Sequence, residues 1–377
     1  MLEYQQKGRF FAQVHRGLEA TAGDELASLS ATDIRPTFCG LHFSATLEDL
    51  ARIVLMTRIC SRILAPLASF SCHSDRKLYG QSRRQIPWER FLDPADRFFI
   101  VANVSDSRIT HSRYAAQVLK DALVDSLRER YQARPSIDKI NPSRVFNLFI
   151  HRNRAVVSLD LGSGALHRRR YRQETVSATL HETTAAALIA LTGWQGERPL
   201  VDPFCGSGTL VAEALMSYCK IPPTWHRREF GLQALPDLDP AVFHRILRTV
   251  KDSIQTLPPG LIRASDHDAH AVSVTRTNLA TLPQGKKIPL DCCDYRRRDD
   301  LAGTTIITNL PYGKRLSVNE TFYRQLGDFL KQRCRGATAW LLCPHSPLIK
   351  SIGLRTSRKI PVFNGPLECR FIRLELY

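Results

Sequence analysis

The chain has 377 residues, which is more than one ordinary domain contains and is typical of two or three domains. Apolar residues make up 43% of the sequence, so the chain can form ordered cores and is not intrinsically disordered. No apolar run reaches the roughly 18 residues of a membrane-spanning helix, and the N-terminal sequence lacks the apolar stretch of a signal peptide. We therefore expect a cytoplasmic protein without a membrane partner.

The ten cysteines and twelve histidines show no spacing that is typical of a metal site. No two cysteines form a CxxC pair, and the adjacent Cys292 and Cys293 are poor partners for a disulfide with each other. Scattered thiols are typical of proteins in a reducing compartment. The sequence therefore predicts neither a bound metal nor a disulfide framework.

The charge of the chain is strongly basic, with 53 Lys and Arg against 36 Asp and Glu and a net charge of +17. Residues 1–164 carry 23 basic and 17 acidic groups, and residues 165–377 carry 30 and 19. Such an excess predicts a polyanionic partner, because cations that contact phosphates release condensed counterions. An arginine-rich proteome is the alternative explanation. The basic runs at 167–172 and 294–300 are, by themselves, typical of solvated loops.

Residues 1–161 combine short strands with helices in the manner of small α+β domains. The run 145–161 predicts two strands joined by a turn at 151–154. We divide this part into a β-α-β-α segment at 1–55 and a second domain at 56–161. The other predicted elements are strands at 9–17, 41–45, 62–70 and 97–105 and helices at 18–29, 47–58 and 113–131.

Residues 162–377 follow a different pattern, and the glycine-rich and then basic stretch at 161–175 marks the boundary. Strands and helices alternate after it, which predicts an α/β fold with a parallel sheet covered on both faces. Prolines interrupt the alternation at about 219–250, which we interpret as an insertion. The predicted elements are helices at 181–193, 209–219, 269–282 and 321–333 and strands at 199–204, 261–266, 287–293 and 304–311.

The segment 200–215 predicts a strand that ends at Asp202, a turn that contains Gly206 and Gly208, and a helix from Thr209. Glycines let the backbone pass close to a ligand, and the helix start offers N–H donors. The pattern is neither GxGxxG nor a phosphate loop, so it does not indicate a pyrophosphate cofactor. An acidic residue at the strand end favours a ligand with an ammonium group. By itself, however, such a turn is purely structural about half the time.

A second acidic strand end follows at Asp266, where a carboxylate can accept hydrogen bonds from ribose hydroxyls. Asp268 directly precedes a predicted helix and is the better candidate for its N-cap. Asp294 follows the next strand and is a candidate for binding an adenine amino group, although an ordinary loop carboxylate is an equal alternative.

The third strand end, at 306–315, carries Asn309, Leu310, Pro311 and Tyr312. An exocyclic base amine is a poor nucleophile because its lone pair is delocalised into the ring. The Asn309 side-chain oxygen and the Leu310 carbonyl could accept its two hydrogens, Pro311 would shape the turn, and Tyr312 would stack on a flipped base. Alone, the tetrapeptide is typical of a turn that ends a strand. Beside Asp202 it predicts a base-amine site.

The motifs DPFCGSGT and TNLPYG resemble those of S-adenosylmethionine-dependent amino-methyltransferases. The match extends to FFAQVHRGLEATAGDELASL, ICSRILAPLASF, KDALVD, LHRRRYR and NGPLECRF, which resemble THUMP-domain methyltransferases. Over nearly the whole chain, the sequence is most similar to the bacterial large-subunit rRNA guanine-N2 methyltransferase family of the RlmL type. The resemblance implies an N-terminal ferredoxin-like segment, a THUMP RNA-binding domain, and a C-terminal Rossmann-like class I methyltransferase domain with a mostly parallel seven-stranded sheet.

The resemblance also implies S-adenosyl-L-methionine as the cofactor and RNA, most of all rRNA, as the partner. It places Asn309, Leu310, Pro311 and Tyr312 at the target base. The implied cofactor contacts are Asp202, Phe204, Cys205, Gly206, Gly208, Asp266 and Asp294, with Thr179 and Glu182 from a helix that closes the pocket. Cys205 lies in the cofactor turn and is not expected to be a nucleophile.

The sequence departs from the family pattern at three points. The usual NPPY is Asn-Leu-Pro-Tyr, a variant that also occurs in THUMP-domain tRNA guanine-N2 methyltransferases. Arg170 replaces a glycine of the junction motif, and we expect no second methyltransferase domain.

Four alternatives to rRNA methylation remain open. They are a tRNA guanine-N2 methyltransferase, an adenine-N6 DNA methyltransferase, a glutamine-directed protein methyltransferase, and a catalytically silent RNA-binding assembly factor. The THUMP-like half argues against DNA and protein substrates, and the intact motifs argue against a silent factor.

Overall fold

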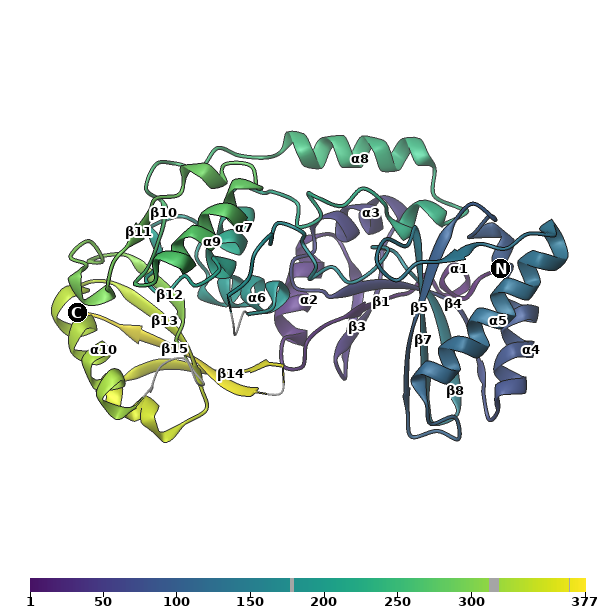
Figure 1. Ribbon diagram of the computed structural model, residues 1–377, viewed down its shortest axis with the longest axis horizontal. Helices are drawn as coiled ribbons and strands as arrows, with labels where there is room; N and C mark the ends of the chain where they lie inside the picture. The colour runs from purple at the N-terminus through teal and green to yellow at the C-terminus, as the bar shows by residue number, and fades with distance from the viewer. Residues whose placement is uncertain (177–179, 312–318, 366) are drawn as a thin grey trace. The chain divides into compact units, whose positions relative to one another are not determined.

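The computed structural model describes residues 1–176, 180–311, 319–365 and 367–377, and its chain forms two compact units (Figure 1). Unit 1 comprises Met1–Val14, Gly23–Leu166 and Arg227–Thr249, and unit 2 comprises His15–Ala22, His167–His226 and Val250–Tyr377. Each unit therefore includes a segment from the other half of the sequence.

The N-terminal half contains thirteen of the described helices and strands before the junction. They are α1 (Glu3–Lys7), β1 (Phe10–Gln13), α2 (Glu19–Ser28), β2 (Thr32–Thr37), β3 (Gly40–Ser44), α3 (Leu47–Met56), β4 (Arg62–Ser71), α4 (Asp75–Gln85), β5 (Arg97–Ser105), α5 (Ser112–Tyr131), β6 (Ser136–Ile137), β7 (Arg144–His151) and β8 (Arg154–Asp160).

All eight strands of unit 1 form one sheet in the order β2-β3-β1-β4-β8-β7-β5-β6. β4 pairs with β1 on one side and with β8 on the other, so the two segments divided at residue 55 share a continuous sheet. The predicted turn between β7 and β8 is confirmed. Its two central residues, Arg152 and Asn153, have φ of 47° and 58°, which suits a two-residue antiparallel hairpin.

The segment interpreted as an insertion, 219–250, packs largely within unit 1 through residues 227–249. The N–H of Leu232 donates to the carbonyl of Leu161 at 2.9 Å, and the Arg227 guanidinium donates to the carbonyl of Ala165 at 3.0 Å. Gly231 lies so close to Asp160 that a Cβ would fall 2.0 Å from its carbonyl oxygen. The segment is therefore a structural part of the N-terminal unit.

The C-terminal half contains α6 (Glu182–Thr192), β9 (Leu200–Asp202), α7 (Thr209–Tyr218), α8 (Pro240–Asp252), β10 (Ile262–Asp266), α9 (Ala269–Ala280), β11 (Leu290–Cys292), β12 (Thr305–Asn309), α10 (Glu320–Arg333), β13 (Thr338–Pro344), β14 (Thr356–Asn364) and β15 (Leu367–Glu375). Short 3-10 helices η1 to η5 occupy Trp88–Arg90, Gly231–Ala234, Gly285–Lys287, Tyr295–Arg297 and Pro347–Ile352.

The seven strands of unit 2 form a sheet in the order β11-β10-β9-β12-β13-β15-β14. The first five are parallel, and β15 and β14 add antiparallel pairs, so the predicted mostly parallel seven-stranded α/β sheet is confirmed. One core cluster joins the sheet to α6, α7 and α9 through Leu188, Leu215 and Leu279. Another joins it to α10 through Leu326 and Leu330, so both faces are covered (Figure 1).

No helix within the described part of the chain combines the length and the apolar character needed to cross a membrane.

Candidate active site

The three sequence motifs meet at one edge of the unit 2 sheet. β10, β9 and β12 are adjacent and parallel, so their carboxyl ends lie side by side. These strands end at Asp266, Asp202 and Asn309 respectively. The order of the strands departs from their order in the sequence here, and a change of this kind is where open α/β sheets bind ligands.

Asp202 is the most buried carboxyl group at this edge, with 1% of the residue exposed. Burial raises the pKa of Asp202 to about 7, because removal from water disfavours the charged form. The Thr308 side chain and the N–H of Phe204, which donates to Oδ1 at 3.1 Å, counteract this rise, while the charge of Asp266 adds to it. The carboxyl group is therefore poised to ionise when a cation approaches.

The glycine turn connects β9 to α7. Gly206 and Gly208 have φ of 54° and 78°, the left-handed region that favours glycine. A Cβ on Gly208 would also lie 2.8 Å from Cγ2 of Thr275, a helix α9 residue that holds the turn by donating to the Gly206 carbonyl at 2.8 Å. The turn thus depends on glycine for both its backbone angles and its packing against α9.

Asp266 ties the glycine turn to the end of β10. It accepts hydrogen bonds from the N–H of Gly206 at 3.0 Å and from that of Asp268 at 3.1 Å. Asp268 itself caps α9 by accepting from the N–H of His270 at 2.9 Å, which confirms the N-cap prediction.

Asp294 follows β11 and is already engaged by neighbouring groups. It caps η4 by accepting from the N–H of Arg296 at 2.9 Å, and its carboxylate forms an ion pair with the Arg296 guanidinium at 2.6 Å. The side-chain hydrogen bonds from Arg296 lower the pKa of Asp294. These contacts hold Asp294 as a charged loop carboxylate.

Cys205 lies inside the glycine turn and is buried against Thr275, with 3.6 Å between Sγ and Oγ1. Burial raises the pKa of the Cys205 thiol well above its ordinary value. Because the thiolate is the nucleophilic form, this environment supports the expectation that Cys205 is not a nucleophile.

Asn309 ends β12 with a buried side-chain oxygen. Among the described residues, no donor forms a hydrogen bond with Oδ1 of Asn309. Leu310 is fully buried, and its N–H donates to the carbonyl of Leu342 at 3.0 Å, which anchors the end of β12 to β13. Pro311 is half-buried, and Tyr312 lies outside the described residues. The site therefore contains an acceptor that is shielded from water and has no donor among the described residues, an arrangement that costs free energy unless a ligand donates to it.

Phe204, predicted to lie against the cofactor, belongs to an aromatic cluster. Its ring centroid lies 4.9 Å from that of Tyr295 and 6.2 Å from that of Phe322. Phe204 and Phe322 are half-buried. The cluster lies on the α10 side of the sheet, where it packs against the core that includes Leu310.

Glu182 begins α6 and forms an ion pair with Arg172, with 3.2 Å between Oε1 and Nε. Thr179, its predicted partner at the cofactor, lies outside the described residues. Arg172 also donates to the hydroxyl of Thr209 at 3.0 Å, so it joins the start of α6 to the start of α7. The Glu182 carboxylate thus has a structural role whether or not it contacts a ligand.

The interpretation of the basic run 167–172 as a solvated loop is wrong for its central residues. Arg169 and Tyr171 are 2% and 1% exposed, and Arg169 forms a buried ion pair with Glu213 of α7 at 3.3 Å. Tyr171 is the only apolar residue of the run, so the charge of its neighbours suggested solvent. Sequence reasoning also missed Thr275 and Asn278, which lie on the buried face of α9.

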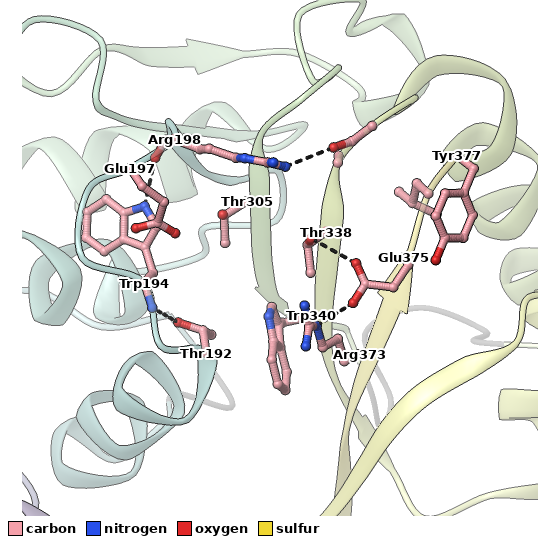
Figure 2. Close-up of a pocket in the computed structure, with 13 residues that line it drawn as sticks. Thr192, Trp194, Glu197, Arg198, Thr305, Thr338, Trp340, Arg373, Glu375 and Tyr377 are labelled. Carbon is pink, nitrogen blue, oxygen red and sulfur yellow. Dashed lines mark hydrogen bonds and ion pairs between the residues drawn. The ribbon is translucent and has the colours of Figure 1, made fainter.

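A separate pocket of about 430 Å³ lies at the opposite edge of the same sheet, where β12 and β13 begin (Figure 2). Trp194 and Trp340 line it, and its Glu197 carboxylate accepts from the N–H of Gln195 at 2.8 Å. Arg373 forms an ion pair with Glu375 at 2.7 Å, and Arg198 donates to the carbonyl of Gly336 at 3.1 Å. This pocket is therefore distinct from the strand ends described above.

Three family models match consecutive parts of the chain. The RMKL-like methyltransferase domain matches residues 169–373, the THUMP domain residues 80–160, and the RlmL ferredoxin-like domain residues 9–64. The chain is 38% identical over 372 residues to slr0064 of Synechocystis sp. (strain ATCC 27184 / PCC 6803 / Kazusa), provisionally named an RNA methyltransferase, and the match covers 98% of this chain and 97% of that protein.

A second relative is the ribosomal RNA large subunit methyltransferase K/L of Syntrophotalea carbinolica (strain DSM 2380 / NBRC 103641 / GraBd1), which is 35% identical over 384 residues. That match covers 98% of this chain and 53% of the relative, so the chain spans about half of its length. Among solved structures, SMU.472, provisionally named a methyltransferase and complexed with SAH, has a TM-score of 0.85 at 23% identity and 98% coverage of both chains, a likeness that shows the fold. The chain therefore belongs to the RlmK/L-type methyltransferases, a family that joins ferredoxin-like and THUMP domains to a methyltransferase domain.

Proposed function

We propose that the chain methylates an exocyclic amine of an RNA base, and that this amine is guanine N2 in large-subunit rRNA. The observation that carries the proposal is the buried Oδ1 of Asn309, which no donor among the described residues engages. A base amine brings two N–H donors, and one of them would satisfy this oxygen. The relatives named RNA and ribosomal RNA methyltransferases support an RNA substrate.

The residues at the strand ends fit S-adenosylmethionine. Asp202 would hold its amino group, Asp266 its ribose hydroxyls and Asp294 its adenine, with Gly206 and Gly208 allowing close approach of the backbone. The raised pKa of Asp202 fits this role, because a carboxyl group that ionises near neutral pH gains most from a cationic partner. When bound, the cofactor supplies a methyl group on a positively charged sulfur.

Asn309 and the carbonyl of Leu310 would orient the base amine by accepting its two hydrogens. This orientation turns the nitrogen lone pair toward the methyl group, and so contributes to the rate by positioning. Leu310 can hold that carbonyl in place because its N–H is anchored to β13 and its side chain is fully buried. Tyr312 would add a stacking surface for the base.

The orienting role of Asn309 predicts different effects for two substitutions. In Asn309→Ala the acceptor is lost, so we expect kcat for methyl transfer to fall by about 10²–10³-fold, the usual cost of losing one preorganised hydrogen-bond partner. In Asn309→Asp the side chain can still accept, so we expect it to retain clearly more activity than the alanine variant. The affinity for S-adenosylmethionine, measured by calorimetry, should stay close to wild type in both.

Methyl transfer from labelled cofactor to rRNA tests this prediction. Near-normal transfer by Asn309→Ala with intact cofactor binding would contradict the assignment. Equal losses in both variants would mean that the side chain acts through its NH2 group or its neutral charge and not through its accepting oxygen alone.

The identity of the RNA is tested by nucleoside mass spectrometry of rRNA and tRNA from a strain that lacks the chain. We expect N2-methylguanosine to disappear from large-subunit rRNA and to return on complementation. Loss from tRNA alone would replace rRNA by tRNA as the substrate. Loss of a methylated base from DNA alone would overturn the proposal.

A further inference from the structure

Residues 169–174, here called the strap, bond to residues of three helices of the methyltransferase unit: α6, α7 and α9. Arg169 pairs with Glu213 of α7, and the Arg172 guanidinium donates to the hydroxyl of Thr209 at the start of α7. At the C-cap of α9, the hydroxyl of Thr281 is shared between the carbonyl of Asn278 at 2.7 Å and the carbonyl of Tyr171 at 3.3 Å. The strap is therefore attached to the elements that frame the glycine turn.

Asn278 of α9 connects the strap directly to that turn. Its Nδ2 donates to the carbonyls of Glu174 and Ser207, both at 3.1 Å. Its Oδ1 accepts from the N–H groups of Gln173 at 2.8 Å and Glu174 at 3.1 Å. With 1% of the residue exposed, the amide uses both hydrogens and both lone pairs inside the protein.

The partners of Asn278 are all backbone groups, so the required feature is the amide itself. An aspartate at this position would keep the two acceptor contacts and lose both donor contacts. The buried carbonyls of Glu174 and Ser207 would then lack these donors and would face a carboxylate oxygen. No apolar residue of similar size could replace any of the four bonds.

Asn278 and Thr275 hold two consecutive carbonyls of the glycine turn from the same face of α9. Thr275 donates to the carbonyl of Gly206, and Asn278 donates to that of Ser207. Residues three apart lie on one side of a helix, so α9 acts as a two-point support. Two neighbouring peptide groups are thereby oriented immediately before Gly208, where α7 begins.

We infer that Asn278 is a positioning residue that holds the Ser207 peptide group, and with it the glycine turn, in the conformation that receives the cofactor. The inference rests on the proposed function for the identity of the ligand. Without the donor contacts, the turn would sample other peptide orientations and would have to be reordered on binding. Asn309 lies at the end of another strand, β12, so we expect a change at Asn278 to leave the base-amine site unaltered.

The test compares Asn278→Asp with Thr281→Val in the full chain. The control, at the C-cap of α9, removes a hydroxyl that donates to the backbone carbonyls of Tyr171 and Asn278, but it removes no bond to the turn and leaves the Asn278 amide intact. For Asn278→Asp we expect Kd and KM for S-adenosylmethionine to rise about tenfold or more, with kcat at saturating cofactor within about threefold of wild type. For Thr281→Val we expect both constants to stay within about threefold. If Asn278→Asp does not fold, Asn278→Ser takes its place.

Hydrogen–deuterium exchange gives a readout that does not depend on activity. In the cofactor-free protein, amides of residues 205–210 should exchange faster in Asn278→Asp and at the wild-type rate in Thr281→Val. A folded Asn278→Asp with wild-type Kd and wild-type exchange at the turn would overturn the inference, and so would equal losses in the control. If the wild-type chain bound no S-adenosylmethionine, the proposed function would fail, while the exchange rates would still decide the role of Asn278.

Discussion

At the scale of single residues, the burial of the Asp202 carboxyl group lowers the stability of the folded state at neutral pH. Its pKa is raised to about 7 in the folded state. Between about pH 4 and pH 7, the folded state therefore keeps a proton that the unfolded state has already released. The folded state therefore loses stability as the pH rises from the unfolded pKa, near 4, to about 7. Such a cost persists in a protein when the charged form is needed for binding.

We predict that Asp202→Asn is more stable than wild type at about pH 8 and close to it near pH 4, because the buried charge is removed. The melting temperature, followed by circular dichroism across this range, measures the difference. A lower melting temperature for the variant at the higher pH would show that the carboxylate is stabilised by its surroundings and not strained.

The same residue predicts the pH dependence of cofactor binding. If ionised Asp202 holds the amino group, the affinity for S-adenosylmethionine should rise by up to about tenfold per pH unit below the pKa and level off above about pH 7. In Asp202→Asn the affinity should be low and should lack this step. Calorimetric titrations in buffers of matched ionic strength provide the measurement.

At the scale of elements, the β9–α7 turn needs glycine at position 208 for two reasons, backbone strain and packing, and a control position separates them. Gly208 and Gly193 both have φ near 75°, but a Cβ would meet Thr275 only at Gly208, while nothing lies within 4 Å of a Cβ at Gly193. Gly193 ends α6 in the same unit and is therefore a matched control.

We predict that Gly193→Ala lowers the free energy of unfolding by about 1 kcal/mol, the cost of an L residue in the left-handed region. Gly208→Ala should lower it by about 2–4 kcal/mol, because the overpacking against Thr275 adds to the strain. Denaturant unfolding monitored by fluorescence measures both. Equal effects at the two sites would mean that α9 moves aside at little cost.

At the scale of the whole molecule, the two units exchange segments of the chain. Residues 227–249 belong to unit 1, where the Tyr4 hydroxyl donates to Asp237 and Leu232 bonds to Leu161. A cut at the sequence boundary near 166 therefore removes part of the N-terminal unit. The units of folding are not the halves of the sequence.

We predict that a fragment of residues 1–166 is poorly folded and that the same fragment with 227–249 attached by a flexible linker is cooperative in thermal unfolding. The attached segment would restore the contacts at Asp160 and Leu161. Calorimetry of the two fragments tests this. Cooperative unfolding of 1–166 alone at the same temperature would show that the segment adds nothing to the unit.

The excess of basic residues is also a property of the whole molecule, and it predicts a surface that binds RNA phosphates. Exposed cations at the end of α10 and the start of β14, among them Arg333 and Arg355, form no ion pair with the described residues, whereas Arg324 of α10 pairs with Glu320 at 3.0 Å. If RNA phosphates contact this surface, Arg333→Ala with Arg355→Ala should weaken RNA binding and reduce the slope of log affinity against log salt by about 1–2. Arg324→Ala, whose charge is already offset, should change the slope less. Fluorescence anisotropy at several salt concentrations measures the slopes.

Much of the local structure could be predicted from the sequence. Asp268 as an N-cap, the β7–β8 turn and the alternation of unit 2 depend on neighbouring residues and on hydrophobic spacing, and the structure confirms them. The motifs also identified Asp202, Asp266 and Asn309, because parallel strands bring their carboxyl ends to one edge. The roles of these residues toward cofactor and base remain predictions.

Only the tertiary structure decided what the strap, α9 and residues 227–249 do. Burial of Arg169 and Asn278 depends on partners about 40 and 70–105 positions away along the chain. Without knowledge of those partners, a charged or amide side chain is expected to lie in solvent. Likewise, nothing local shows that 227–249 packs on the first unit. The sequence by itself determined the elements and the chemistry at their ends, because these depend on spacing along the chain. Long-range contacts determined which polar groups are buried, because burial depends on the whole fold.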